Sequence, residues 1–189
     1  MIRSVLSAFL FFGITGLVWA QDRQGNDTPG DWITKHFEKY GLYTTACDER
    51  PENGVLKQRC YIRYVDIFSE APKFAAVVFF VFQKDRKTAI QYGSEPGTVM
   101  AADGLRVESG NGWVITWKAT ETCREGHDCL MSDEKEVADT LAAFSAGGEL
   151  VQEFTDRHGA EQLLKWDLAG FAEAYSDYLK QSKARNLLD

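Results

Sequence analysis

The sequence lacks any cluster of basic residues. It has 21 lysines and arginines against 28 aspartates and glutamates, which gives a formal net charge of −7 at pH 7. Affinity for nucleic acid comes largely from lysine and arginine contacts with phosphate, and docking on anionic lipid uses polybasic segments. The composition therefore argues against a nucleic-acid partner and against simple electrostatic attachment to a membrane.

The residues of hydrolytic chemistry are also scarce. The chain has three histidines, His36, His127 and His158, and no Gly-x-Ser-x-Gly elbow. No nucleophile–base pair is evident, so each histidine is expected in a solvated loop. Acid pairs carry little information, because 28 acidic residues form many accidental pairs. We expect a protein that is not an enzyme and needs no cofactor, with a hydrolase of unrecognised site as the least favoured alternative.

Cysteine is limited to four residues, Cys47, Cys60, Cys123 and Cys129. The short interval from the third to the fourth also contains His127 and Asp128, which raises the alternative of a metal site. Structural zinc usually takes four ligands from paired short motifs, and the first two cysteines lack that spacing. An even number of cysteines in an exported chain indicates disulfides. Three connectivities are possible; we favour Cys47–Cys60 and Cys123–Cys129, because each pair brackets a polar, turn-rich segment (48–54 and 124–128).

The N-terminus has the pattern of a cleavable secretory signal over residues 1–20. Arg3 precedes an apolar run over residues 5–17, and Val18-Trp19-Ala20 supplies a cleavage site. The run is shorter than the roughly 20 apolar residues of a membrane span, and no cysteine follows the cleavage site to carry a lipid. We expect a periplasmic protein, with outer-membrane association or secretion as alternatives and no transmembrane segment after cleavage.

The mature chain has the length of one domain, without internal repeats or linkers. Residues 21–39 are predicted to form a loose N-terminal segment, although 31–40 would also suit a short helix or strand. Residues 40–189 are predicted to form a single disulfide-stapled domain.

Most of that domain has the pattern of β-structure. Alternating apolar residues rich in β-branched and aromatic types predict strands over 42–47, 58–67, 88–92, 105–108, 113–120, 150–154 and 162–168. The apolar stretch 74–82 is predicted to be a central strand buried on both faces. Asn111-Gly112 predicts a hairpin turn.

Two segments have the helical period instead. Residues 133–145 place Val137, Leu141 and Phe144 on one face, with Ser132 or Asp133 as N-cap and Gly147-Gly148 as the stop. The C-terminal segment has an apolar stripe made of Phe171, Ala174, Tyr175, Tyr178 and Leu179. The fold class expected from these elements is an antiparallel β-sandwich with one short internal helix and a C-terminal amphipathic helix.

Three apolar features are candidates for binding. Trp113 and Trp117 share one face of a strand with Ile115 and Ala119, and exposed aromatics often anchor interfaces. Together with His127 and Asp128, the two tryptophans form the candidate binding surface, although the same alternation suits a sandwich core. The 74–82 strand would serve as core or as the wall of an apolar pocket. The C-terminal stripe would pack on a sheet or on a partner helix.

The order of several landmarks resembles the invasion-associated locus B family of exported bacterial proteins. The landmarks are Tyr-Gly-Leu-Tyr-Thr-Thr-Ala-Cys-Asp (40–48), Arg-Cys-Tyr-Ile (59–62), Pro-Gly (96–97), Ala-Asp-Gly-Leu-Arg-Val (102–107), the pair Cys123 and Cys129, and Asp-Leu-Ala-Gly-Phe-Ala-Glu-Ala (167–174). The chain departs from the family at Tyr43, where tryptophan is usual, and at Asp128, where glycine usually precedes the fourth cysteine.

The resemblance implies a β-rich periplasmic or envelope-associated protein, from a family linked in pathogens to entry into host cells. It supplies no catalytic residues. We expect an envelope protein that binds other envelope or host-surface proteins, with a periplasmic carrier of a small apolar ligand as the alternative. A cavity lined by Phe79, Phe80 or Trp117 would favour the carrier, and a closed core would favour a binding surface.

Overall fold

The structure is a computed structural model that describes residues 32–69, 75–94, 100–118, 123–124, 128–156 and 158–189. The predicted signal over residues 1–20 and its cleavage site lie outside these residues. None of the described helices combines the length and the apolar character needed to cross a membrane.

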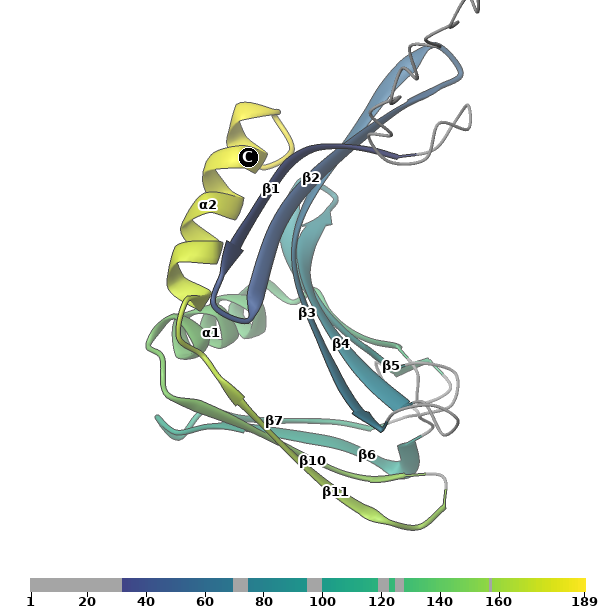
Figure 1. The fold of residues 1–189 in the computed structure, drawn as a ribbon, viewed down its shortest axis with the longest axis vertical. Helices are drawn as coiled ribbons and strands as arrows, with labels where there is room; N and C mark the ends of the chain where they lie inside the picture. Colours follow the sequence, from purple (N-terminus) through teal and green to yellow (C-terminus); the bar gives the residue numbers. More distant parts are fainter. Residues whose placement is uncertain (1–31, 70–74, 95–99, 119–122, 125–127, 157) are drawn as a thin grey trace, which may run out of the picture.

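Seven strands form an antiparallel sheet, here called sheet A (Figure 1). Its strands, in spatial order, are β1 (Ile33–Tyr40), β2 (Tyr43–Glu52), β3 (Val55–Ser69), β4 (Ala75–Lys84), β5 (Lys87–Ser94), β9 (Asp128–Met131) and β8 (Cys123–Arg124). Consecutive strands from β1 to β5 pair as neighbours, which is the simplest antiparallel order.

Four strands form a second antiparallel sheet, sheet B, and two helices complete the fold. Sheet B has the order β11 (Glu161–Asp167), β10 (Glu149–Asp156), β6 (Met100–Ser109) and β7 (Val114–Trp117). The helices are α1 (Glu134–Ser145) and α2 (Phe171–Ala184). Both helices and sheet B lie on the same side of sheet A (Figure 1). The predicted antiparallel β-sandwich with an internal and a C-terminal helix is confirmed.

Both helices bury the faces that their apolar periods predict. Helix α1 is capped by Asp133, whose Oδ1 accepts hydrogen bonds from the backbone N–H groups of Lys135 and Glu136, each at 3.0 Å. Its buried residues include Val137, Leu141 and Phe144. Helix α2 buries Phe171, Ala174, Tyr178 and Ser182, so the C-terminal stripe packs into the core.

Two hairpin turns follow from Asn-Gly pairs. The predicted hairpin at Asn111-Gly112 is confirmed, because the Ser109 N–H donates to the Trp113 carbonyl at 2.9 Å. Asn53 and Gly54 both have positive φ, 52° and 76°, as a two-residue hairpin turn requires. The prediction of a loop over 48–54 was wrong outside this turn. Strand β2 continues to Glu52, and the polar residues that suggested a loop belong to a strand pair.

The 74–82 stretch alternates rather than being buried on both faces. Val77, Phe79 and Val81 are fully buried beneath the helices and sheet B, whereas Phe80 and Phe82 are half-buried on the opposite side. The prediction that both faces of this strand are buried was therefore wrong for Phe80 and Phe82. Phe80 and Phe82 thus lie on the side of sheet A that faces away from the core.

The first disulfide is confirmed as Cys47–Cys60. Both cysteines are completely buried, and they are directly opposite each other across the β2–β3 ladder. Cys129 is also disulfide-bonded, and its Cα partner in the β8–β9 ladder is Cys123. The described residues contain no free cysteine.

Residues 33–39, predicted as part of a loose segment, form most of strand β1. A register irregularity between Thr34 and His36 interrupts the pairing of β1 with β2, which explains why the apolar residues of β1 show no regular period. Residues 21–31 of the predicted loose segment lie outside the described part.

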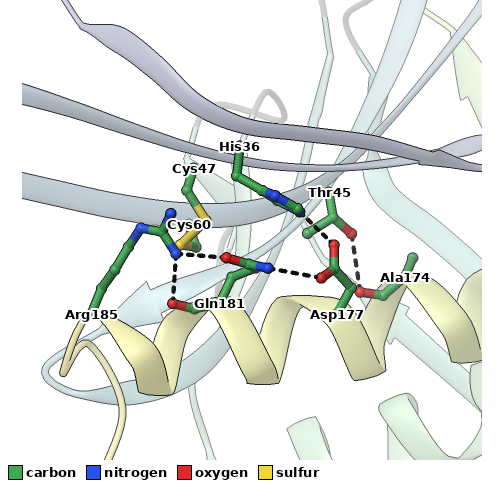
Figure 2. Close-up of polar contacts among 8 residues, drawn as sticks. All are labelled: His36, Thr45, Cys47, Cys60, Ala174, Asp177, Gln181 and Arg185. Atoms are coloured by element: carbon green, nitrogen blue, oxygen red, sulfur yellow. Dashed lines mark hydrogen bonds and ion pairs between the residues drawn. A yellow bond between two sulfur atoms is a disulfide. The ribbon is translucent and has the colours of Figure 1, made fainter.

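His36 is not the solvated loop histidine that the sequence suggested. It lies on β1, and its Nε2 is 2.6 Å from Asp177 Oδ2 on α2 (Figure 2). The same carboxylate accepts a hydrogen bond from the Gln181 side chain at 3.2 Å. Close by, the Thr45 hydroxyl donates to the Ala174 carbonyl at 3.0 Å. These contacts attach α2 to the first two strands of sheet A. His158 lies in the turn between β10 and β11.

Replacing Asp177 with asparagine is expected to lower the free energy of unfolding by about 2 kcal/mol at pH 7, because a largely buried carboxylate loses charge-assisted hydrogen bonds. Burial raises the pKa of Asp177, but its hydrogen bonds with His36, Gln181 and Tyr40 outweigh burial and set the pKa below the ordinary 3.8. The carboxylate thus stabilises the fold fully above about pH 3.8 and loses that contribution as pH falls through the lowered pKa.

Urea unfolding of wild type and Asp177→Asn at a series of pH values measures this effect. The difference between the two proteins should be constant near neutrality and shrink below pH 3.8. Asp139→Asn is the matched control, since Asp139 is exposed on α1 and pairs only with Lys135 among the described residues. An Asp177 effect no larger than that of Asp139 would contradict the prediction.

Candidate binding face

The structure does not bring the predicted surface residues together as a platform. Trp117 is 3% exposed and its ring lies 4.7 Å from that of Tyr92. Trp113 is half-buried with its ring edge-on to Phe144 at 5.5 Å. The two tryptophans thus belong to the core. Of the two interpretations of this strand face, a sandwich core and a binding surface, the structure supports the core. His127 and the side chain of Asp128 lie outside the described part.

The side of sheet A that faces away from α1, α2 and sheet B is here called the outer face. Antiparallel Cα partners project to the same side of a sheet, so the register defines rows of side chains across it. One row, the apolar row, consists of Phe37, Ala46, Tyr61, Phe82 and Ala89. The next, the cationic row, consists of Lys39, Thr44, Arg63, Phe80 and Gln91.

Asp48 organises the end of the outer face nearest the β2–β3 turn. Its carboxylate is 5% exposed and accepts hydrogen bonds from Arg59 at 3.1 and 3.2 Å, from the Tyr61 hydroxyl at 3.1 Å and from the Thr34 hydroxyl at 3.1 Å. Burial, followed by the charge and hydrogen bond of Asp48, raises the pKa of Tyr61. The Tyr61 hydroxyl therefore stays protonated as a donor, and the paired Arg59 guanidinium offsets the charge of Asp48.

A stack of cations and rings extends from this carboxylate. The Arg59 guanidinium lies 4.0 Å from the centroid of the Trp32 ring and 5.6 Å from that of Tyr61, and Arg50 lies 4.7 Å from the same Trp32 ring. Cation–π contacts of this kind fix long side chains that would otherwise move freely. The Tyr61 ring in turn meets Phe80 at 6.2 Å and 72°.

The parts of the two rows on β3, β4 and β5 line a groove of about 410 Å³, within the usual size range of ligand sites. Its lining includes Arg59, Tyr61, Arg63, Phe80, Phe82 and Gln91. None of the lining residues is acidic. Arg59 is paired with Asp48, whereas Arg63 and Lys39 are exposed and form no ion pair within the described residues. The groove therefore offers aromatic surface together with the unpaired cation Arg63, and Lys39 extends the positive charge along the same row beyond the groove.

The outer face of sheet B differs in its charges. Arg106 pairs with Glu108 and with Glu153, and Lys165 pairs with Glu149. These exposed charges neutralise each other in place. The contrast makes the outer face of sheet A the stronger candidate for binding.

The core beneath the sheet is packed by rings. Phe79 lies 5.1 Å from Tyr92 and 5.4 Å from Phe144 between ring centroids. Phe79 and Trp117 are two of the residues expected to line a carrier cavity. Each of them instead packs against the ring of Tyr92. Phe80, the third, faces the open groove. Within this core the Tyr92 hydroxyl and both amide atoms of Gln152 are buried without a hydrogen-bond partner among the described residues.

Two segments of the family resemblance, 40–48 and 167–174, meet in space. The Tyr43 hydroxyl donates to the Asp167 carbonyl at 3.1 Å, and the Tyr43 and Phe171 rings are 5.2 Å apart. The turns beside them touch through backbone: a Cβ at Gly170 would lie 2.6 Å from the Tyr40 carbonyl oxygen. These residues join sheet A to α2, so in this chain the two segments form a structural contact.

No family model matches the chain, and no curated protein matches it. Among solved structures, the crystal structure of invasion associated protein B from Bartonella henselae matches with a TM-score of 0.53 at 19% sequence identity. The match covers 78% of this chain and 99% of that chain. The two proteins share a fold. This is the family that the sequence landmarks resemble, and the identity is too low to extend the likeness beyond the fold.

Proposed function

We propose that the protein is a non-enzymatic, exported protein of the bacterial envelope that binds another envelope or host-cell component. The binding surface in this proposal is the outer face of sheet A. The predicted secretory signal, the disulfides and the fold shared with invasion associated protein B support export.

The observation that carries the proposal is the composition of the outer face. Tyrosine, phenylalanine and arginine are enriched where proteins bind each other, and here they line one groove. Phe37 at the end of the apolar row is 53% exposed, so it adds accessible aromatic surface to the outer face. The Asp48 hydrogen bonds hold Arg59 and Tyr61 in position before binding, which lowers the entropy cost of association.

Photo-crosslinking in the native cells tests this function. A photoreactive phenylalanine analogue placed at Phe37 is expected to form adducts with a partner that mass spectrometry can identify. The same analogue at Val114 is the matched control, because Val114 is 47% exposed on the outer face of sheet B. Adducts should form at position 37 and not at position 114.

Two results would contradict the proposal. Equal adducts at both positions would show non-specific contact, and no adduct at position 37 on cells that carry the protein would show that the outer face has no partner there. Repeating the experiment with host cells distinguishes a host component from an envelope component.

A periplasmic carrier of a small ligand is the second candidate. It is favoured by the Tyr92 hydroxyl and the Gln152 amide, two buried polar groups without a partner in the described core, since such groups cost free energy unless something bonds them. Native mass spectrometry of protein from its own envelope fraction tests it: a discrete adduct lost on denaturation would support the carrier, and the bare mass would oppose it.

A further inference from the structure

We infer that the outer face of sheet A binds an extended, acidic segment of a partner protein. In this arrangement two carboxylates of the segment pair with Lys39 and Arg63, and an apolar side chain between or beside them packs against Tyr61, Phe80 and Phe82. The inference rests on the proposed function and specifies the chemistry of its partner.

Charge is the first step of the argument. Lys39 and Arg63 stand in the same row, separated only by Thr44, and both are exposed. Neither forms an ion pair within the described residues, although the chain as a whole is acidic and most of the described arginines have a carboxylate nearby. Asp48 contacts the groove residues Arg59 and Tyr61, and its charge is offset by the ion pair with Arg59. An anionic ligand would therefore meet attraction along this row and little repulsion.

Spacing is the second step. Lys39 lies on β1 and Arg63 on β3, two strands apart. Adjacent strands are about 4.8 Å apart, so the two backbones are separated by roughly 10 Å. An extended chain advances about 3.3 Å per residue, and its side chains alternate between two sides, so only residues an even number of positions apart face the same way. Acidic residues four positions apart therefore face the sheet together and are separated by about 13 Å. The flexible arms of lysine and arginine absorb the remaining mismatch.

The shape of the aromatic surface favours a side chain over a sugar ring. Tyr61 and Phe80 meet at 72°, so their rings form a notch and not a flat platform. A notch accepts the edge of a leucine or phenylalanine side chain, whereas a pyranose stacks on a flat ring. Gln91 follows Phe80 in the same row and lines the groove. These features favour a protein segment over an acidic polysaccharide.

Binding of a defined peptide tests the inference. The probe is a fluorescein-labelled heptapeptide, Glu-Ser-Phe-Ser-Glu-Ser-Phe, blocked at both ends, whose glutamates and phenylalanines share one side when it is extended. The same peptide with lysine in place of glutamate is its control. Fluorescence anisotropy with the full mature chain is expected to show saturable binding of the acidic peptide only. The affinity should fall as ionic strength rises towards 0.15 M, where the screening length is about 8 Å.

Charge-removing variants locate the site. The double variant Lys39→Gln/Arg63→Gln is expected to weaken binding of the acidic peptide about tenfold or more, since it removes both cations of the row. Lys118→Gln is the matched control, because Lys118 is an exposed lysine that follows β7 in sheet B. All these side chains are exposed, so thermal unfolding midpoints should be unchanged and a loss of binding would not reflect unfolding.

Each of three outcomes overturns the inference. These are equal binding of the acidic and basic peptides, no loss in the Lys39/Arg63 variant, and preferential binding of polygalacturonate over the acidic peptide, which would assign the face to an acidic glycan. In each case photo-crosslinking with the analogue at position 37 shows whether the proposed function still holds. If its adducts persist, the outer face binds a partner of different chemistry; if they are absent as well, both proposals fail.

Discussion

Replacing Gly104 with alanine is expected to lower the free energy of unfolding by about 3 kcal/mol or more. Gly104 is in β6 with φ of +84°, and a Cβ there would lie 1.7 Å from the Trp117 carbonyl oxygen and 2.7 Å from its carbonyl carbon. The left-handed backbone alone costs an L-residue about 1–2 kcal/mol, and overpacking against rigid backbone adds about 1–3 kcal/mol. Relief of the clash would separate β6 from β7, which pairs through Leu105 and Trp117.

Gly112→Ala is the matched control for this prediction. Gly112 has nearly the same φ, +87°, but a Cβ there would meet no atom within 4 Å. Its substitution should therefore cost only the backbone strain. Urea unfolding of both variants measures the difference, and equal losses would show that the close approach at Trp117 relaxes without cost.

The sequence predicted the fold class well because the local signals agreed with the tertiary structure. The cap at Asp133, the stop at Gly147-Gly148 and the turn at Asn111-Gly112 are all formed by neighbouring residues, so no distant partner was needed to find them. The apolar stripe of α2 likewise predicted its buried face.

The errors arose where a distant partner decides the outcome. Strand β1 was left undecided between a loose segment, a short helix and a strand, because Ile33, Phe37 and Tyr40 have no regular period across the irregularity at His36. The environment of His36 depends on Asp177, 141 residues further along the chain. Residues 48–52 suggested a loop because they are polar, although outward-facing polar residues are compatible with a strand.

The candidate site was missed for a related reason. The aromatic stretch 74–82 suggested burial on both faces, so Phe80 and Phe82 were counted as core. The two side chains are partly exposed because no described helix or sheet covers the outer face. The spacing of apolar residues within one strand does not show which face of a sheet is covered. The alternation Arg59, Tyr61, Arg63 was visible in the sequence. Its meaning required the register that places these residues opposite Phe82 and Phe80.

Removing the Cys47–Cys60 disulfide is expected to cost about 3 kcal/mol. The bridge closes a loop of 13 residues in sequence separation, and a loop of this size restricts the unfolded chain by about that free energy. The prediction applies to the double variant Cys47→Ala/Cys60→Ala, which leaves no lone buried thiol. Urea unfolding without reductant measures the change and leaves the disulfide of Cys129 intact.

The slope of the unfolding curve provides a second test of the same mechanism. Without the bridge the unfolded chain is less compact and exposes more surface, so the dependence of the unfolding free energy on urea should become steeper. A loss below about 1 kcal/mol would mean that the β2–β3 pairing alone restricts these residues. A large loss without a steeper slope would place the stabilisation in core packing of the sulfur atoms.

The contact between the turns at Tyr40–Gly41 and Ala169–Gly170 also sets an order of events during folding. The Cys47–Cys60 bridge joins neighbours within one hairpin, so it can close as soon as residues 43–60 are free to pair. The inner face of β1 to β3 is completed only by α2, more than a hundred residues later. In a chain synthesised from its N-terminus, the residues of the bridge are therefore present long before the helix that covers them. Strands β1 to β3 thus expose an apolar inner face for as long as α2 is missing.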